Sequence, residues 1–414
     1  MTAVAPDDVH DPTSSPRPNA PPKLLPRDLR VTIIRDAREL AQHVPAWRRL
    51  ADAALEPNPF YEPWMLLPAL EHLRGDAPLE VALVHGPTVD DAPALLCGLF
   101  PLERRRHFHG VPLPSACLWR HRQCFSTTPL LHAGHAAATL GALFDWLRDD
   151  QRAPRLVELP LVATDGPLHR YLTEALYERG LEACVFGGYA RALLRPAADA
   201  EQYLRAALSS DRRRELRRRE RRLAELGRLQ YQELSAARVD GDGDGDGDRA
   251  LAKFTREFLA LEARGWKGRE ASALGSTPGD RRFFERVLLA AFRDGRLVGE
   301  TLRLDGAPIA AQCTFTAGEG AFAFKIAFDE RHARHSPGAL LVLYCMQRMH
   351  ERTPRRWLDT CSAADSPFKQ LFTERRLLHS VVLQTRADRL SGAVVAGLPL
   401  FGWVRRRLRN TGAS

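Results

Sequence analysis

The sequence contains the same arrangement of strand-forming segments twice, and this repetition limits the folds that the chain can adopt. In the first half, EVALVHG (80–86) and ALLCGLFPL (94–102) are apolar runs separated by a polar turn. In the second half, RLVGETLRLDGAPIAAQCTFTAG (296–318) is again a strand, a turn and a strand. Helix-forming segments precede both pairs, and this alternation predicts an α/β fold with mixed sheets. We therefore expect two related units in tandem, each of roughly 170–200 residues.

The repetition divides the chain into two expected domains, at residues 30–200 and 201–390. Residues 1–29 are polar and rich in proline, so we expect a disordered tail there. Residues 391–414 contain the run RRRLR and are expected to form a basic tail. The longest apolar run, 390–404, is broken by glycines and a proline and falls short of the ~20 residues that span a bilayer. With its arginines it could touch an anionic membrane surface, but packing against the protein is the favoured interpretation.

Composition places the chain among soluble globular proteins, with 44% hydrophobic and 27% charged residues. Its seven cysteines are scattered and form no CxxC pair, which argues against a zinc ribbon or a disulfide framework and favours the cytoplasm. The N-terminus lacks the apolar core of a signal peptide. The acidic repeat 240–248 resembles the start of a calcium-binding EF-hand loop. However, the position that requires a bidentate glutamate is Leu251 or, in the later register, Lys253, so no metal site is expected.

The most basic segment is SSDRRRELRRRERR (209–222), in which eight of the eleven residues from Arg212 to Arg222 are arginine. Leucines at helical spacing form an apolar stripe along it: Leu208, Leu216, Leu223 and Leu226. We expect a helix that docks through this stripe and exposes arginine. Three roles remain open for it: a solvated helix between domains, contact with an anionic acceptor or partner, and DNA readout. No aromatic residue interleaves the arginines, so a stacking platform is absent and no specific DNA binding is expected.

The segment AFAFKIAFDERHARHSPGALL (321–341) combines a strand, a short loop and the start of a helix. Strand alternation places one set of bulky residues on a single face: Phe322, Phe324, Ile326 and Phe328. Lys325 and Asp329 lie among alanines on the other face, which describes a strand beside a cleft. The alternative is an edge strand that presents these two side chains to solvent. Ser336 suits the N-cap of the helix and Pro337 its first position, and free N–H groups at such a start can bind phosphate.

The segment RRWLDTCSA (355–363) is predicted to be a neighbouring strand. Asp329 and Asp359 would then lie on adjacent strands, where either could act as a general base or hold an ammonium group by its charge. Direct transfer between two bound substrates needs no covalent intermediate, so Cys361 is not expected to be a nucleophile.

Several of these segments together resemble the CelD-like family of GNAT-type acetyltransferases, which is associated with cellulose biosynthesis and related to the Fem-type aminoacyl ligases. The segments are LEARGWKGREASAL, LDGAPIAAQ, FKIAFDERHARHSPG and WLDTCSAADSPFK. The specific motifs span about 204–380, and a weaker resemblance extends over about 30–385. The resemblance implies tandem GNAT-like domains, the N-terminal one degenerate. The chain departs from the family in replacing the tyrosines of its YDE…YSPG-like motifs.

The resemblance implies transfer of an acyl group from acetyl-CoA or another acyl-CoA, with no metal, to an amine on a small-molecule or sugar-type acceptor. It also implies a loop that holds the cofactor diphosphate, here formed by Arg334, His335, Ser336, Gly338, Ala339 and Leu340. Pro337 lacks an N–H in this loop, so one amide contact is missing. The residues expected to contact the acceptor are Trp266, Lys267, Lys325 and Lys369. For Trp266, packing into the core beside a glycine helix end is an equal alternative.

Three functions follow from these observations. The first is an acyl-CoA-dependent N-acyltransferase in polysaccharide or cell-envelope biosynthesis, cytoplasmic or peripheral at the inner membrane face through its basic tail. The second is a Fem-like transferase that uses aminoacyl-tRNA and contacts it through the arginine helix. The third is a non-enzymatic protein that binds nucleic acid or a membrane surface, and whose binding is lost at high salt.

Overall fold

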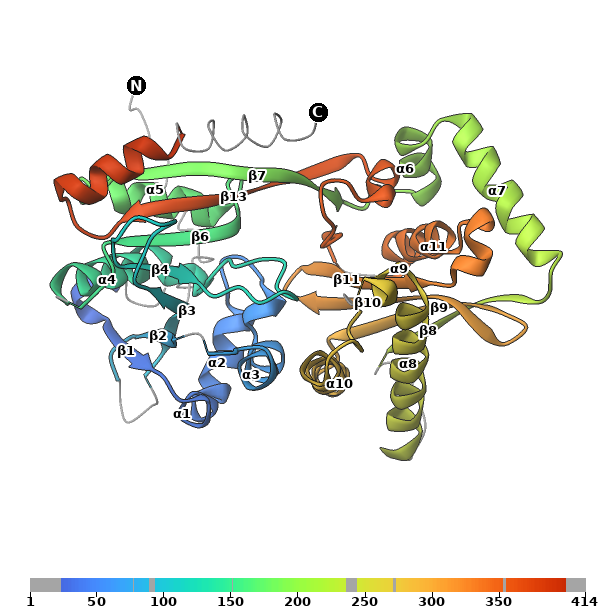
Figure 1. Ribbon diagram of the computed structural model, residues 1–414, viewed down its shortest axis with the longest axis horizontal. Coiled ribbons are helices and arrows are strands. Elements are labelled where there is room, and N and C mark those ends of the chain that lie inside the picture. Colours follow the sequence, from blue (N-terminus) through green and yellow to red (C-terminus); the bar gives the residue numbers. More distant parts are fainter. Residues whose placement is uncertain are drawn as a thin grey trace, which may run out of the picture.

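A computed structural model describes residues 24–76, 78–88, 94–150, 152–235, 244–270, 273–352 and 355–399. Across these residues the strands form one 13-stranded mixed sheet with helices packed on it (Figure 1). The expected α/β fold class with mixed strands is confirmed.

The first unit contains an antiparallel group of strands, followed by a helix and a parallel strand. Its strands are β1 (Arg30–Ile34), β2 (Leu79–His85), β3 (Leu96–Arg105), β4 (Ser115–Leu118), β5 (Leu130–Leu131) and β6 (Leu156–Ala163). Its helices are α1 (Ala37–Gln42), α2 (Val44–Asp52), α3 (Pro63–His72), α4 (Ala136–Asp149) and α5 (Pro167–Glu178). The long strand β7 (Ala183–Leu194) leads to α6 (Ala200–Ala207) and to the arginine helix α7 (Ser210–Ala224).

The second unit follows the same order. Its strands are β8 (Leu229–Ser235), β9 (Leu297–Leu304), β10 (Ala307–Ala317), β11 (Gly320–Phe328), β12 (Trp357–Asp359) and β13 (Glu374–Gln384). Its α-helices are α8 (Asp244–Arg264), α9 (Trp266–Arg269), α10 (Pro278–Arg293) and α11 (Pro337–Arg352). Two short 3-10 helices flank the site described below, η5 (Glu330–His335) and η6 (Pro367–Leu371).

The pairing of the strands repeats between the two units. In the first unit β1, β2, β3 and β4 pair antiparallel, and β4 then pairs in parallel with β6 after the helix α4. In the second unit β8, β9, β10 and β11 pair antiparallel, and β11 pairs in parallel with β12 after the helix α11. The two segments that share a strand–turn–strand pattern in the sequence are β2–β3 and β9–β10. The expected tandem of related units is therefore present in the topology.

The strands β7 and β13 run from one unit to the other and join them (Figure 1). β13 pairs with β6 of the first unit and with the whole length of β7, while the end of β7 pairs with β12 of the second unit. The expected boundary between residues 200 and 201 therefore does not divide the sheet, because β13 lies beyond it in the sequence but beside β6 in space. A sequence pattern cannot reveal this exchange, since it depends on pairing between strands far apart in the chain.

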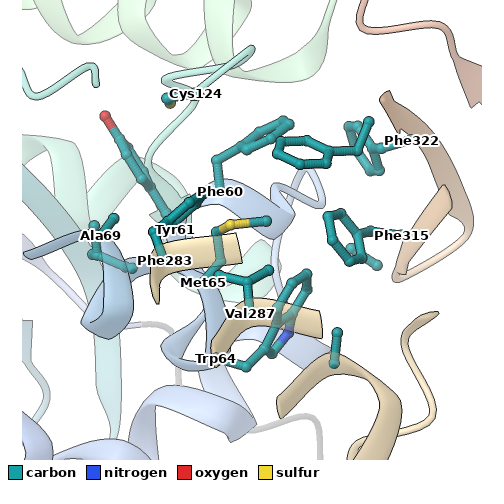
Figure 2. Close-up of a cluster of buried hydrophobic side chains, with 14 of the residues drawn as sticks. Phe60, Tyr61, Trp64, Met65, Ala69, Cys124, Phe283, Val287, Phe315 and Phe322 are labelled. Atoms are coloured by element: carbon teal, nitrogen blue, oxygen red, sulfur yellow. The ribbon is translucent and has the colours of Figure 1, made fainter. Parts of the chain in front are cut away.

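The largest group of buried apolar side chains also crosses between the units. Figure 2 shows Phe60 and Trp64, from the first unit, beside Phe315 and Phe322, from β10 and β11. The ring centroids of Trp64 and Phe315 are 5.0 Å apart, and those of Phe60 and Phe322 are 6.0 Å apart. Burial of large aromatic side chains at this contact gives the two units a shared hydrophobic cluster, in addition to smaller clusters elsewhere in the described residues.

The two expected tails lie mostly outside the described residues. Residues 389–399, however, are helical, and Ser391, Val395 and Leu398 are buried, which agrees with a segment that packs against the protein. Among the described helices none has the length and apolar character needed to cross a bilayer. The membrane contact expected of the basic run near the C-terminus stays a prediction.

Candidate functional site

The strand β11 contains a β-bulge that changes which side chains share a face. Cys313 of β10 pairs with Lys325 and Thr314 pairs with Ala323, so Phe324 is an extra residue without a partner in register. The predicted alternation is therefore wrong beyond Phe324. Phe322 and Phe324 pack in the core shared by the units, whereas Ile326 and Phe328 pack on the side of α11. A bulge also leaves backbone groups of the strand outside the regular ladder.

The parallel pair β11 and β12 separates soon after it begins. The two strands are paired only from Gly320 with Trp357 to Phe322 with Asp359, and β11 continues to Phe328 paired with β10 but not with β12. After Asp359 the chain turns away, and the N–H of Thr360 donates to the carbonyl oxygen of Ala192 on β7. The bulged part of β11, 323–328, is therefore not paired with β12.

The start of α11 lies at the end of this unpaired segment. The short helix η5 connects β11 to Ser336, which adopts a left-handed backbone conformation with φ 54°. The carbonyl oxygen of Ser336 accepts from the N–H of Leu340 at 3.1 Å, so Ser336 is the residue that precedes the helix, as expected. Pro337 follows as the first helical residue and has no N–H to offer.

The residues expected to hold a cofactor are brought together at this point, but several of them are covered. A Cβ added to Gly338 would lie 3.1 Å from both Phe328 and Phe368, so a side chain here would press against both rings. Ala339 and Leu340 are buried against neighbouring elements. Arg334 is exposed, and its Nε donates to the Nε2 of the buried His335 at 3.0 Å.

Two arginines of α7 also reach this loop, although no sequence motif identifies them. The Nη1 of Arg219 donates to the Oγ of Ser336, and α7 packs against η5. Arg222 lies one helical turn further along the same face. Burial, together with the charges of nearby cations that include Arg334, Arg222 and Arg219, lowers the pKa of His335. The imidazole is therefore neutral near pH 7, and the positive charge at the loop belongs to the arginines.

The two aspartates proposed as bases do not lie together. Asp359 is opposite Phe322, and Asp329 follows β11 seven residues later, which corresponds to about 20 Å along a strand. Asp359 is 1% exposed and contacts Arg191 at 3.3 Å and Arg376 at 3.2 Å. Each aspartate is thus held by arginine rather than placed as a free base.

Asp329 has a structural role at the start of η5. Its carboxylate accepts from the backbone N–H and the guanidinium of Arg331, and this hydrogen bonding lowers its pKa. A carboxylate that binds its proton less tightly than usual is a weaker general base.

The residues expected to contact an acceptor are dispersed. The backbone of Trp266 and Lys267 forms α9, but their side chains lie outside the described residues. Lys325 is half-buried, with its Nζ 5.7 Å from the ring centroid of Phe125 in the first unit. Lys369 is exposed, and its Nζ donates to the carbonyl oxygen of Ala364 at 3.1 Å. Only Lys325 therefore lies on β11.

A buried carboxyl group that the sequence does not single out lies beneath α11. Glu300 of β9 is 5% exposed, and the hydroxyl of Thr314 donates to its Oε2 at 3.2 Å. Burial raises the pKa of Glu300 to about 8. The sequence does not indicate that Glu300 is buried, because the side chains that cover it come from other elements.

In the first unit, the corresponding region around β4, β6 and α4 is lined by apolar side chains. Between β4, β6 and α4 lies a small cavity of about 30 Å³ whose lining is entirely apolar: Phe100, Leu102, Leu118, Pro129, Leu140, Leu143, Phe144, Leu147, Val157, Leu159, Leu168, Leu172 and Leu383. Such a lining offers no partner for a phosphate or an amine.

The described residues contain no group of three or more histidine, cysteine or acidic side chains that could hold a metal ion. Their cysteines are buried and free of disulfide bonds. Burial raises the pKa of the Cys361 thiol well above its usual value, so Cys361 is not activated as a nucleophile.

Comparison with known proteins gives one match to a family. Residues 210–370 match the sequence model described as the acetyltransferase (GNAT) domain. No curated protein sequence matches the chain.

The chain is also similar to solved structures at low sequence identity. FemX is 11% identical over 85% of this chain and 96% of that chain, with a TM-score of 0.49. A tandem GNAT protein from the clavulanic acid biosynthesis pathway is 13% identical over 87% and 99%, with a TM-score of 0.41. A conserved protein of unknown function from Bacteroides thetaiotaomicron is 11% identical over 86% and 99%, with a TM-score of 0.47. The family match covers α7, β11 and α11, and the site described above therefore lies within the segment that matches the acetyltransferase (GNAT) domain model.

Proposed function

We propose that the protein is an acyl-CoA-dependent N-acyltransferase whose donor site lies between β11, α11 and α7. The observation that carries this proposal is the segment of β11 that β12 leaves unpaired, which ends at the start of α11 inside the region that matches the GNAT domain. A thioester arm could lie along the part of β11 beyond its pairing with β12, with the phosphates of the donor at the loop before α11.

In this proposal the backbone of β11 stabilises the charge that develops during the reaction. The N–H groups near the bulge at Phe324 would donate to the thioester carbonyl as negative charge develops on its oxygen. The amine attacks that carbon, the C–S bond breaks, and coenzyme A leaves as the thiolate, which takes up a proton from solvent. Asp329 and Asp359 keep their structural ion pairs, and the amine proton passes to solvent rather than to either carboxylate.

The acceptor would approach from the side of β11 that faces α8 and the first unit. Lys325 lies there beside Phe125, a residue of the first unit, so both units would border the acceptor. The resemblance of GWKG, FDERHARHSPG and WLDTCSAADSPFK to the CelD-like family supports an amine acceptor from polysaccharide or cell-envelope biosynthesis, such as an amino sugar.

Calorimetric titration with acetyl-CoA, longer acyl-CoAs and free CoA tests the donor. We expect saturable binding of CoA and its thioesters, and no binding of any of them would contradict the proposal. Turnover is then tested with acetyl-CoA and a panel of amino sugars and nucleotide-linked amino sugars. Release of CoA, measured by chromatography, should depend on the amine.

A further inference from the structure

The arginine helix α7 has more arginines than carboxylates, and only some of its arginines form ion pairs. On the outer face, Arg214 pairs with Asp211 and Arg218 pairs with Glu215. On the face toward η5, Arg219 shares Glu215 with Arg218 and also binds Ser336, while no carboxylate partner of Arg222 is found within the described residues. Arg212, Arg213, Arg217 and Arg221 likewise have no carboxylate partner within the described residues, so positive charge remains on more than one side of α7, including the side beside the loop that precedes α11.

The carboxylates of this loop do not neutralise that charge, because each already has its own arginine. Asp329 pairs with Arg331, and Glu330 pairs with Arg269 at 2.9 Å. Arg334 contacts His335, which is neutral near pH 7. Arg219, Arg222 and Arg334 thus form a cluster of cations, which we call the arginine cluster, and its charge suits a ligand with more than one negative charge.

The backbone of the loop is a poor phosphate site by itself. Pro337 has no N–H, and the Oγ of Ser336 is engaged by Arg219. Phe328 and Phe368 lie against Gly338 and limit access to the first turn of α11. A phosphorylated ligand at this loop therefore depends on side-chain cations for most of its contacts.

The position of α7 is fixed independently of any ligand. Leu216 and Leu223 are 2% and 0% exposed and pack in clusters that include residues of α11, and the Oγ of Ser209 accepts from the N–H of Arg212 at 3.2 Å to begin the helix. Arg219 and Arg222 are therefore presented to the loop by a docked helix, so the backbone that carries them is already ordered before a ligand binds.

We propose that Arg219 and Arg222 of α7 complete the donor site by binding the diphosphate of the thioester donor, in place of the backbone contact that is missing at Pro337. This inference rests on the proposed function. It assigns the arginine helix to recognition of a small phosphorylated ligand and not to nucleic-acid binding.

The test compares three ligands and three proteins by calorimetry. The ligands are CoA, dephospho-CoA, which keeps the diphosphate, and pantetheine, which has no phosphate. The proteins are the wild type, the double variant Arg219→Gln/Arg222→Gln, and the control Arg214→Gln, which removes an exposed arginine of the outer face. We expect the double variant to bind CoA and dephospho-CoA about tenfold or more weakly, with pantetheine unchanged and the control like the wild type. Circular dichroism checks that all three proteins are folded.

Two results would overturn the inference alone. One is a wild type that binds CoA while the folded double variant binds it equally well. The other is a loss of pantetheine binding as large as the loss of CoA binding, which would mean that the arginines do not act through phosphate. Failure of the wild type to bind CoA would instead overturn the proposed function together with this inference.

Discussion

At the scale of single residues, Asp359 and Asp329 show how the same side chain takes different energetic roles. Both accept from arginine, but Asp359 and its partner Arg191 are almost fully buried, whereas the side chain of Arg331, the partner of Asp329, is 76% exposed. Removing one member of a buried ion pair leaves the other charge without compensation, while an exposed pair contributes little.

We therefore expect Asp359→Asn to lower the free energy of unfolding by about 3–5 kcal/mol. Asp329→Asn should lower it by less than about 1 kcal/mol, because asparagine can still accept from the N–H of Arg331 and water can solvate the guanidinium. Urea denaturation of the two variants and the wild type measures both values. Equal effects of the two substitutions would contradict the account of Asp359 as a buried structural anion.

Glu300 should make stability depend on pH. Burial raises its pKa from 4.5 to about 8, so the folded state keeps a proton that the unfolded chain releases above pH 4.5. The stability that Glu300 contributes is thus present at low pH, is lost progressively as pH rises from about 4.5 to about 8, and changes no further above that. Glutamine at position 300 does not titrate.

The measurement is the free energy of unfolding of the wild type and of Glu300→Gln at pH 5, 6, 7 and 8. We expect the free energy of unfolding of the variant, relative to that of the wild type, to increase steadily from pH 5 to pH 8. Other buried groups, such as Glu62, whose pKa burial raises to about 7, are present in both proteins and cancel in the difference. A difference that stays constant with pH would show that Glu300 is ionised in the folded protein.

At the scale of elements, the sequence predicts α7 well and β11 less well. The leucine stripe of α7 is docked as predicted for Leu216 and Leu223, because helical spacing decides which residues share a face. Leu208 is also buried, but it precedes α7 in an extended conformation, so helical spacing does not account for its burial. The prediction that Leu226 belongs to the docked stripe is wrong: its side chain is 47% exposed, because the helix has already ended at Ala224. In β11 the alternation fails at the bulge, which is set by pairing with β10 and leaves no mark in the local sequence.

The docking of α7 can be tested through its leucines. Leu216→Ala and Leu223→Ala should each lower the free energy of unfolding by about 2–5 kcal/mol, because each deletes buried methyl groups and leaves a cavity. Leu226→Ala, on the exposed continuation of the same stripe, should change it by less than about 0.5 kcal/mol. If all three variants were as stable as the wild type in urea, α7 would not be docked on α11.

The sequence predicts the loop before α11 but does not predict which arginines of α7 lie beside it. Ser336, Pro337 and Gly338 are adjacent in the chain and have recognisable preferences at the start of a helix. Arg219 lies more than a hundred residues earlier and reaches Ser336 only because two leucines place α7 against α11. Contacts that depend on packing between distant elements cannot be predicted from local spacing.

At the scale of the whole molecule, the two units share too much structure to be independent. β13 pairs with β6 and β7, β7 pairs with β12, and the aromatic core around Phe60 and Trp64 includes side chains from both units. Ion pairs such as Arg296 with Asp52, at 2.7 Å, also cross between the units. The repetition in the sequence predicts two units correctly but cannot show that they exchange a strand.

We therefore expect one cooperative unfolding transition for the whole chain. In differential scanning calorimetry the calorimetric enthalpy should equal the van't Hoff enthalpy. Far-ultraviolet circular dichroism and tryptophan fluorescence should report the same midpoint. Two resolved transitions would mean that the units unfold separately and that the contacts made by β13 and the aromatic core are weak.

We propose that only the second unit carries a donor site, at the loop between β11 and α11. Hydrogen exchange with and without CoA, read out by mass spectrometry, tests it without any substitution. We predict slower exchange of backbone amides in 329–340 and on the adjoining part of α7. Exchange should be unchanged in the counterpart of the first unit, 132–140, beside its apolar cavity. No protection at 329–340, or equal protection of both segments, would contradict the account.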